Sequence, residues 1–98
     1  MSNSKSRYDI DFENGRVEKD WFALKGEFPE RVSDCEEFLR NNPEDRRKAI
    51  GILKKLKGRH KGKLQYDITK NDARVWYFVD RKERMVVIKY AGHHPDKY

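Results

Sequence analysis

The sequence contains a single cysteine, Cys35, so no disulfide can form within the chain and no metal site can be built on cysteines. Its neighbours Asp34, Glu36 and Glu37 would raise the pKa of the thiol and discourage nucleophilic chemistry. We therefore expect Cys35 to be a small buried apolar residue.

Long apolar runs and common catalytic signatures are also missing. No stretch approaches the length of a membrane span, and residues 1–14 contain no apolar core of a secretion signal. We therefore expect a cytoplasmic protein without a membrane partner. The sequence has no GxSxG, HExxH or glycine-rich phosphate loop, and no internal repeat divides its 98 residues, which predict one domain over residues 1–98.

Charge is abundant, and it is unevenly distributed. Charged residues make up 41% of the chain and the net charge is +6. Residues 1–50 carry 10 Lys/Arg and 12 Asp/Glu, whereas residues 51–98 carry 13 Lys/Arg and 5 Asp/Glu. A positive field confined to one half suggests a polyanionic partner such as nucleic acid or an acidic protein, although a solvated surface would look the same.

Apolar periodicity predicts an α+β fold: an N-terminal strand, a helical hairpin of two to three helices, and a three-stranded antiparallel sheet. Alternation predicts the first strand over residues 8–13. Helical spacing predicts helices over residues 17–26, 29–41 and 43–57, of which the last two would form the hairpin. Alternation returns in three further segments, at residues 63–68, 74–79 and 85–90.

The two faces of the predicted sheet differ in chemistry. Helices should cover the more aliphatic face, with Leu64, Tyr66, Ile68, Val75, Tyr77 and Val79. The open face then carries Lys63, Gln65, Asp67, Arg74, Trp76 and Phe78, joined on the last strand by Val87, Lys89, Ala91 and His93. An open-face aromatic ring can stack an RNA base or be covered by another segment. We expect Phe78 to be covered and keep both alternatives for Trp76.

The segment KKLKGRHKGK, residues 54–63, contains six cations and no acid. We assign Lys54, Lys55 and Lys57 to the end of the predicted third helix, where cations complement the dipole. We assign the cations beyond that helix to RNA phosphates, namely Arg59, Lys61 and Lys63.

The tail AGHHPDKY follows the last strand and carries His93, His94 and Tyr98. RNA cleavage without a metal needs a base for the 2′-hydroxyl, an acid for the leaving 5′-oxygen and cations for the phosphate. Histidine serves either proton-transfer role, and arginine serves the phosphate. Two histidines are too few for a metal site, and we do not expect His60 to complete one, so we predict no metal and no cofactor.

The C-terminal half resembles the RelE/ParE toxin superfamily from about residue 20 to residue 98. Arg74, Val75, Tyr77 and Val79 fit a G-x-R-[VIL]-x-Y-x-[VI] pattern. Gly92, His93 and Tyr98 fit a G-H-x-x-x-x-Y pattern. The resemblance implies a toxin of a type II toxin–antitoxin system that cleaves mRNA, in many members on the 70S ribosome, and an antitoxin encoded beside it that blocks the active face.

Position by position, the resemblance implies roles for Arg74, for His93 or His94, and for Tyr98. It also implies a polar role for strand positions Lys63, Gln65 and Asp67, and the sequence departs at Gln65, which cannot transfer protons. The leading hypothesis is an endoribonuclease in which Arg74 clamps the phosphate. His93 or His94 would be base or acid with Asp67 or Tyr98 as its counterpart, and RNA would be bound by Arg59, Lys61, Lys63, Trp76 and Lys89.

Two alternatives remain. One is a non-catalytic inhibitor similar to the gyrase-poisoning branch of the superfamily. The other is an RNA- or protein-binding module with a degenerate site. The nuclease hypothesis requires one geometric condition: Arg74, Lys63 and the tail imidazoles must converge on a single phosphodiester.

Overall fold

The computed structural model describes residues 7–45 and 53–93. Its helices are α1 (Gly15–Glu27), α2 (Pro29–Asn41) and a short 3-10 turn η3 (Gly58–His60). Its strands are β1 (Asp9–Phe12), β2 (Leu53–Lys55), β3 (Leu64–Asp67), β4 (Arg74–Asp80) and β5 (Met85–Gly92). The predicted α+β class is confirmed.

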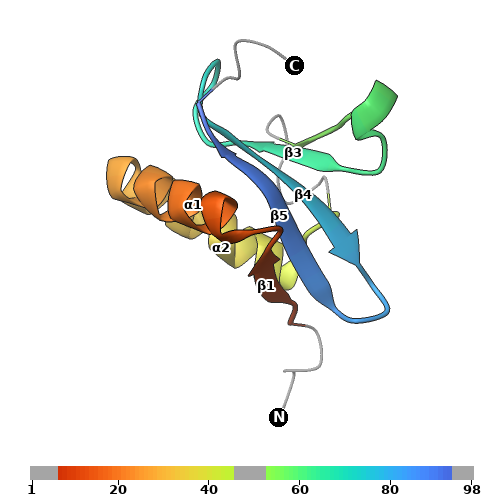
Figure 1. Cartoon of the computed structure of the whole chain (residues 1–98). Coiled ribbons are helices and arrows are strands. Elements are labelled where there is room, and N and C mark those ends of the chain that lie inside the picture. Colours follow the sequence, from red (N-terminus) through yellow and green to blue (C-terminus); the bar gives the residue numbers. More distant parts are fainter. Residues whose placement is uncertain (1–6, 46–52, 94–98) are drawn as a thin grey trace.

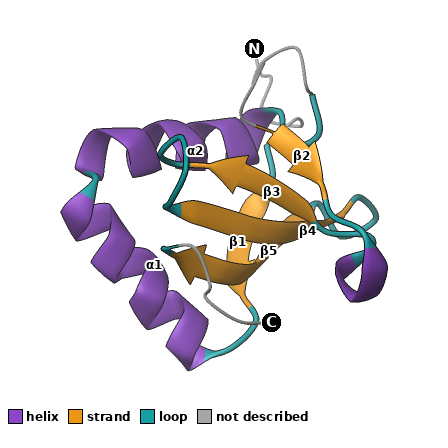
Figure 2. Ribbon diagram, turned by 90° about the horizontal axis from the view of Figure 1, so that it is seen from above, coloured by secondary structure: helices purple, strands orange, loops and turns teal. Residues whose placement is uncertain are grey.

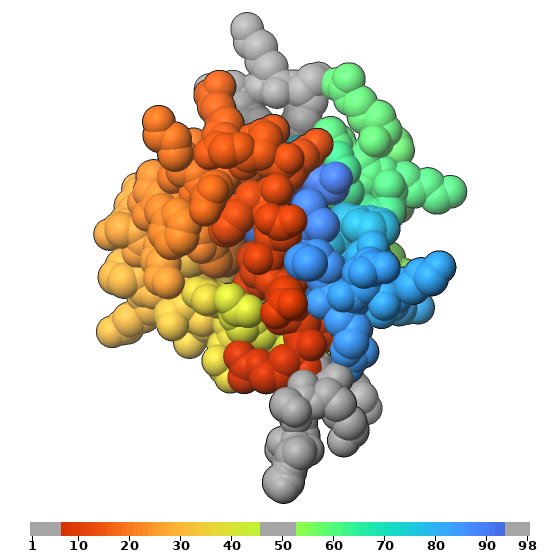
Figure 3. All heavy atoms as spheres, turned by 60° about the horizontal axis from the view of Figure 1, so that its bottom comes forward, coloured from red at the N-terminus to blue at the C-terminus, as the bar shows by residue number. Residues whose placement is uncertain are grey.

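The strands form one sheet in the order β1-β5-β4-β3-β2. β1 runs parallel to β5, and the other neighbours are antiparallel. Helices α1 and α2 lie on the same face of this sheet, so within residues 7–45 and 53–93 neither of them covers the opposite face (Figures 1 and 2). Figure 3 shows the red N-terminal segment lying between the helical side and the blue C-terminal strands, as the pairing of β1 with β5 requires.

Local signals explain the helical layer. The Asn14 side chain accepts a hydrogen bond of 3.0 Å from the backbone N–H of Val17 and so caps α1. Pro29 begins α2, where its missing N–H has no helical partner to lose. The helices bury an apolar stripe against the sheet, formed by Val17, Trp21, Leu24, Val32, Cys35, Phe38 and Leu39. Cys35 is fully buried, and burial raises the pKa of its thiol.

Two expectations about the fold were wrong in detail. The sheet has five strands rather than three, because β1 and β2 both join it. The third helix predicted over residues 43–57 does not continue through Leu53–Lys55, which is an edge strand, and the hairpin is formed by α1 and α2. Residues 46–52 of that prediction lie outside the described part of the chain. Short apolar runs do not distinguish a helix from a strand, and a short lysine-rich strand is typical of a sheet edge.

No described helix is both long and apolar enough to span a bilayer.

Candidate RNA-binding face

The predicted alternation on β3 and β4 is confirmed. Tyr66, Val75 and Tyr77 are buried against the helices. The register pairs Gln65 with Trp76 and Asp67 with Arg74 on the opposite face. Cross-strand partners share a face, so the open side of the sheet brings together an amide, a carboxylate, a guanidinium and an indole.

The prediction of which β5 side chains point to the open face was wrong for the second half of that strand. A bulge opposite Trp76 and Tyr77 pairs Tyr90 with Trp76 and Ala91 with Val75. Tyr90 therefore joins the open face, and Ala91 is buried in the core at 3% exposure. An inserted residue reverses the phase of a strand. Lys89 is the residue at the bulge and is half-buried, and its contact with RNA stays a prediction.

A buried polar network lies at the centre of this face. Trp76 Nε1 donates to Gln65 Oε1 at 2.8 Å, and Gln65 Nε2 donates to Asp67 Oδ1 at 2.7 Å. Lys54 Nζ lies 3.4 Å from Asp67 Oδ2. Trp76 is only 6% exposed, so of the two alternatives kept for its ring, cover by neighbouring side chains is the one observed, and its contact with RNA stays a prediction. Gln65, which cannot transfer protons, instead fixes the orientation of Trp76 and Asp67.

The imidazole of His60, which was not expected to take part in a site, covers one end of the network. The ring of His60 lies 4.7 Å from that of Trp76, and the ring of Tyr90 lies 5.1 Å from that of Trp76. Lys63 Nζ lies 3.3 Å from His60 Nδ1. Burial, Lys63 and Arg59 lower the pKa of His60 below its ordinary value. The ring is therefore neutral near pH 7 and can accept a proton.

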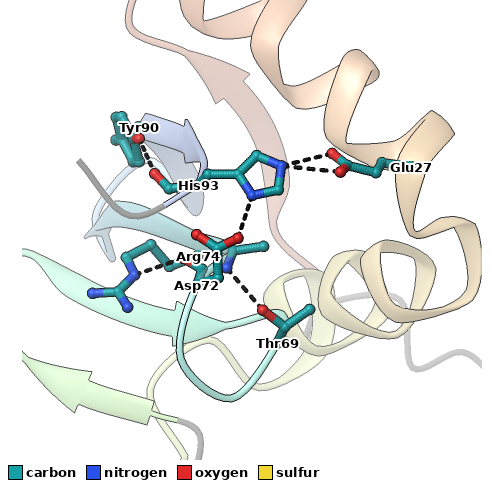
Figure 4. Close-up of polar contacts among 7 residues, drawn as sticks. Glu27, Thr69, Asp72, Arg74, Tyr90 and His93 are labelled. Carbon is teal, nitrogen blue, oxygen red and sulfur yellow. Dashed lines mark hydrogen bonds and ion pairs between the residues drawn. The ribbon is translucent and has the colours of Figure 1, made fainter. Parts of the chain in front are cut away.

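Arg74 occupies the opposite end of the β3–β4 pair. Its Nε donates to the backbone oxygen of Asp72 at 3.1 Å. Its terminal nitrogens have no hydrogen bond to any residue that the structure describes, and Figure 4 shows the guanidinium directed away from His93. Arg74 lies across from Asp67 at the end of β3, whereas Lys63 lies just before the start of β3. The backbones of Arg74 and Lys63 are therefore separated by about 13 Å in the strand direction. Long side chains can span much of that distance, and both can reach one RNA strand.

His93 lies elsewhere, so this imidazole does not meet the geometric condition set for the nuclease hypothesis, and His94 lies outside the described residues. Its Nδ1 is 2.5 Å from Asp72 Oδ2, and its Nε2 is 2.8 Å from Glu27 Oε1 at the end of α1 (Figure 4). The Tyr90 hydroxyl donates to the backbone oxygen of His93. The imidazole therefore ties α1 to the β3–β4 turn on the helical side of the sheet. Asp72 and Glu27 raise the pKa of His93.

Replacing His93 with Gln should lower the thermal midpoint near pH 5.5 and have little effect near pH 9. Because the pKa of His93 is raised in the folded state, its stabilisation is complete below the pKa of an unfolded histidine, about 6.5, and is lost as pH rises through the folded pKa. Thermal midpoints of both proteins across this range test it. A difference that grows with pH would contradict this assignment. The matched variant His60→Gln should show the opposite trend, because the pKa of His60 is lowered.

The remaining predicted residues divide into two groups. Arg59 and Lys61 are exposed beside His60, where they can meet phosphates, and Lys63 is half-buried. His94 and Tyr98 lie outside the described residues, so their roles stay predictions. Within residues 7–45 and 53–93, no cluster of three or more His, Cys, Asp or Glu side chains is arranged to hold a metal ion.

Sequence reasoning missed three contributors: His60, Tyr90 and Lys54. His60 had a usable signal, since a histidine inside a tract of cations without acids has a lowered pKa wherever the tract folds. Lys54 was hidden by the helix predicted there, and Tyr90 was hidden by the bulge.

This mixed sheet with both helices on one face is similar in fold to toxins of the RelE/ParE type in solved structures. A chain in the YoeB–YefM complex from Staphylococcus aureus is 25% identical, with a TM-score of 0.63 over 91% of this chain and 99% of that one. A chain in the RelE–RelB complex from Pyrococcus horikoshii is 21% identical, with a TM-score of 0.66 over 93% of this chain and 99% of that one. A chain in the DinJ–YafQ complex from E. coli is 19% identical, with a TM-score of 0.67 over 90% of this chain and 93% of that one. No protein-family model and no curated protein matches the chain.

Proposed function

We propose that the chain is the toxin of a type II toxin–antitoxin system, an endoribonuclease that cleaves mRNA on the 70S ribosome with its own side chains. The observation that carries this proposal is the open sheet face, where Arg74, Lys54 and Lys63 accompany the neutral imidazole of His60. The similar folds of YoeB, RelE and YafQ, each seen in a complex with an antitoxin, support the same proposal. The chain's own partner would be a cognate antitoxin that covers this face.

The chemistry starts at the His60–Lys63 pair. An ammonium group only donates hydrogen bonds, so Nδ1 of the neutral imidazole is the acceptor in this pair. A 2′-hydroxyl that replaces Lys63 at Nδ1 can pass its proton to the ring as its oxygen attacks the adjacent phosphorus. The displaced ammonium of Lys63 then lies beside the phosphate, whose developing charge it stabilises.

The other groups hold the RNA strand, with Arg74 at the end of the β3–β4 pair opposite His60. Arg74 offers a planar donor fork that stays charged at any working pH. Both oxygens of Asp67 are engaged, one by Gln65 and one by Lys54, so Asp67 serves as an anchor for Lys54. The bond from phosphorus to the 5′-oxygen then breaks, and that oxygen needs a proton. His93 directs both ring nitrogens at carboxylates, so we assign this acid to His94 or Tyr98.

Replacing His60 with Ala should lower cleavage by about 10²–10⁴-fold, because a positioned general base is lost. The matched control is Arg59→Ala, which removes a neighbouring exposed cation but leaves the imidazole, and should lower cleavage only modestly. The measurement is the rate of transcript cleavage with translating ribosomes. Equal losses of cleavage in the two variants would show that His60 contributes no more than a neighbouring RNA-binding side chain, and would contradict its role as the base.

Induction of the protein in a bacterial host tests the function as a whole. We expect growth arrest, new 5′ ends within translated transcripts, and recovery when the product of the neighbouring open reading frame is expressed together with it. A DNA-damage response with intact transcripts would identify the gyrase-poisoning alternative. Salt-sensitive RNA binding without arrest or cleavage would identify a binding module.

A further inference from the structure

A groove of about 920 Å³ opens where the β2–β3 connection meets the end of β4. Six cations line it: Lys55, Lys57, Lys61, Lys63, Arg81 and Lys82. Its two acids are Asp80 and Glu44, and Glu44 is already paired with Arg81 at 2.8 Å. The groove therefore combines positive charge with apolar lining residues, namely Leu64, Phe78 and Val79.

Phe78 is the exposed aromatic ring of this groove. It is 41% exposed, whereas Trp76, two residues earlier on the same face of β4, is 6% exposed. The expectation that Phe78 is covered is not met within the described residues, whereas Trp76, for which both alternatives were kept, is the covered ring. An exposed ring among cations is the arrangement with which proteins bind unpaired bases.

The groove is continuous with the candidate site. Lys63 lines the groove, and its Nζ is also 3.3 Å from His60 Nδ1. Leu64 pairs with Tyr77, which places Lys63 next to Phe78 across the strands. An RNA strand whose phosphate contacts Lys63 at the site therefore has a flanking nucleotide beside Phe78.

We propose that this groove binds one unpaired base flanking the scissile phosphate, with Phe78 stacked on the base and the surrounding lysines on the backbone. The inference rests on the proposed function for the identity of the ligand as single-stranded RNA. It adds a base-binding subsite that lies outside the reacting groups and holds the strand in register.

The test measures binding separately from cleavage. A 2′-O-methyl oligonucleotide, which cannot be cleaved, is titrated with the protein, and each nucleotide in turn is replaced by an abasic one. In the wild type, one abasic position should weaken binding by about 5- to 150-fold, the value of one base–aromatic stack. In Phe78→Ala this penalty should fall to about 1-fold, and Phe78→Trp should retain it.

Phe22→Ala is the matched control, because Phe22 is 54% exposed but lies on α1, in the layer on the other face of the sheet. It should leave the abasic penalty unchanged. An equal penalty in the wild type and Phe78→Ala would overturn the proposal, as would a wild type that binds no single-stranded RNA at low salt. Loss of binding to the neighbouring gene's protein alone would identify a protein-docking surface instead. A Phe78-dependent penalty in a protein that cuts no RNA would sustain the subsite and contradict only the nuclease.

Discussion

Arg74→Ala is expected to fold normally and to lose growth inhibition, with cleavage reduced by about 10²–10³-fold. Among the described residues the guanidinium makes one hydrogen bond, from Nε to the backbone of Asp72, so its removal should cost little stability. Its charge and planar donor fork lie at the start of β4, where they can meet an RNA phosphate, and a preorganised donor at a developing charge typically contributes such a factor. The measurement pairs the cleavage rate with the thermal midpoint of the purified variant.

Arg74→Lys is the control. It keeps the charge but loses the two-pronged donor geometry, and it should recover only part of the activity. A stably expressed Arg74→Ala protein that still arrests growth would remove Arg74 from the mechanism.

Gln65→Leu is expected to reduce the free energy of unfolding by about 2–6 kcal/mol. The substitution leaves two buried groups without their partners, the indole N–H of Trp76 and an oxygen of Asp67, each at a cost of about 1–3 kcal/mol. Urea denaturation measures this loss. Cleavage should fall as well, because Asp67 no longer holds Lys54 in a fixed position.

A double-mutant cycle separates this network from ordinary packing. Trp76→Phe removes the donor that Gln65 satisfies, so Gln65→Leu should cost less in that background, with a coupling of about 0.5–3 kcal/mol. Strictly additive losses would show that the hydrogen bond between the two side chains contributes nothing to stability.

The sequence alone was sufficient to predict which side chains of β3 and β4 lie on each face of the sheet. Strict alternation decides which side chains point to the helices, and Tyr66, Val75 and Tyr77 follow it. The same reasoning failed on β5, because both faces of that strand are apolar and nothing in the alternation marks the bulge before Ala91. It also failed at Leu53, where helical and strand periods agree over three residues.

The candidate site was harder to predict because its contacts are non-local. His93 fits a tail motif, but its partners Glu27 and Asp72 lie 66 and 21 residues away in the sequence, and only folding shows that they hold the imidazole. Trp76 looked exposed because its strand position faces away from the helices. His60, Tyr90 and Gln65, which no local pattern connects, cover it from three sides.

The central claim is that groups on the open face of the sheet cleave RNA by activating its own 2′-hydroxyl. The most direct measurement follows one mapped cleavage position in an mRNA on the ribosome, with the ribose before the scissile phosphate either natural or 2′-deoxy. We expect the natural RNA to yield a 2′,3′-cyclic phosphate end and the deoxy substrate to remain intact at that position. Cleavage of the deoxy substrate at an undiminished rate would contradict the account.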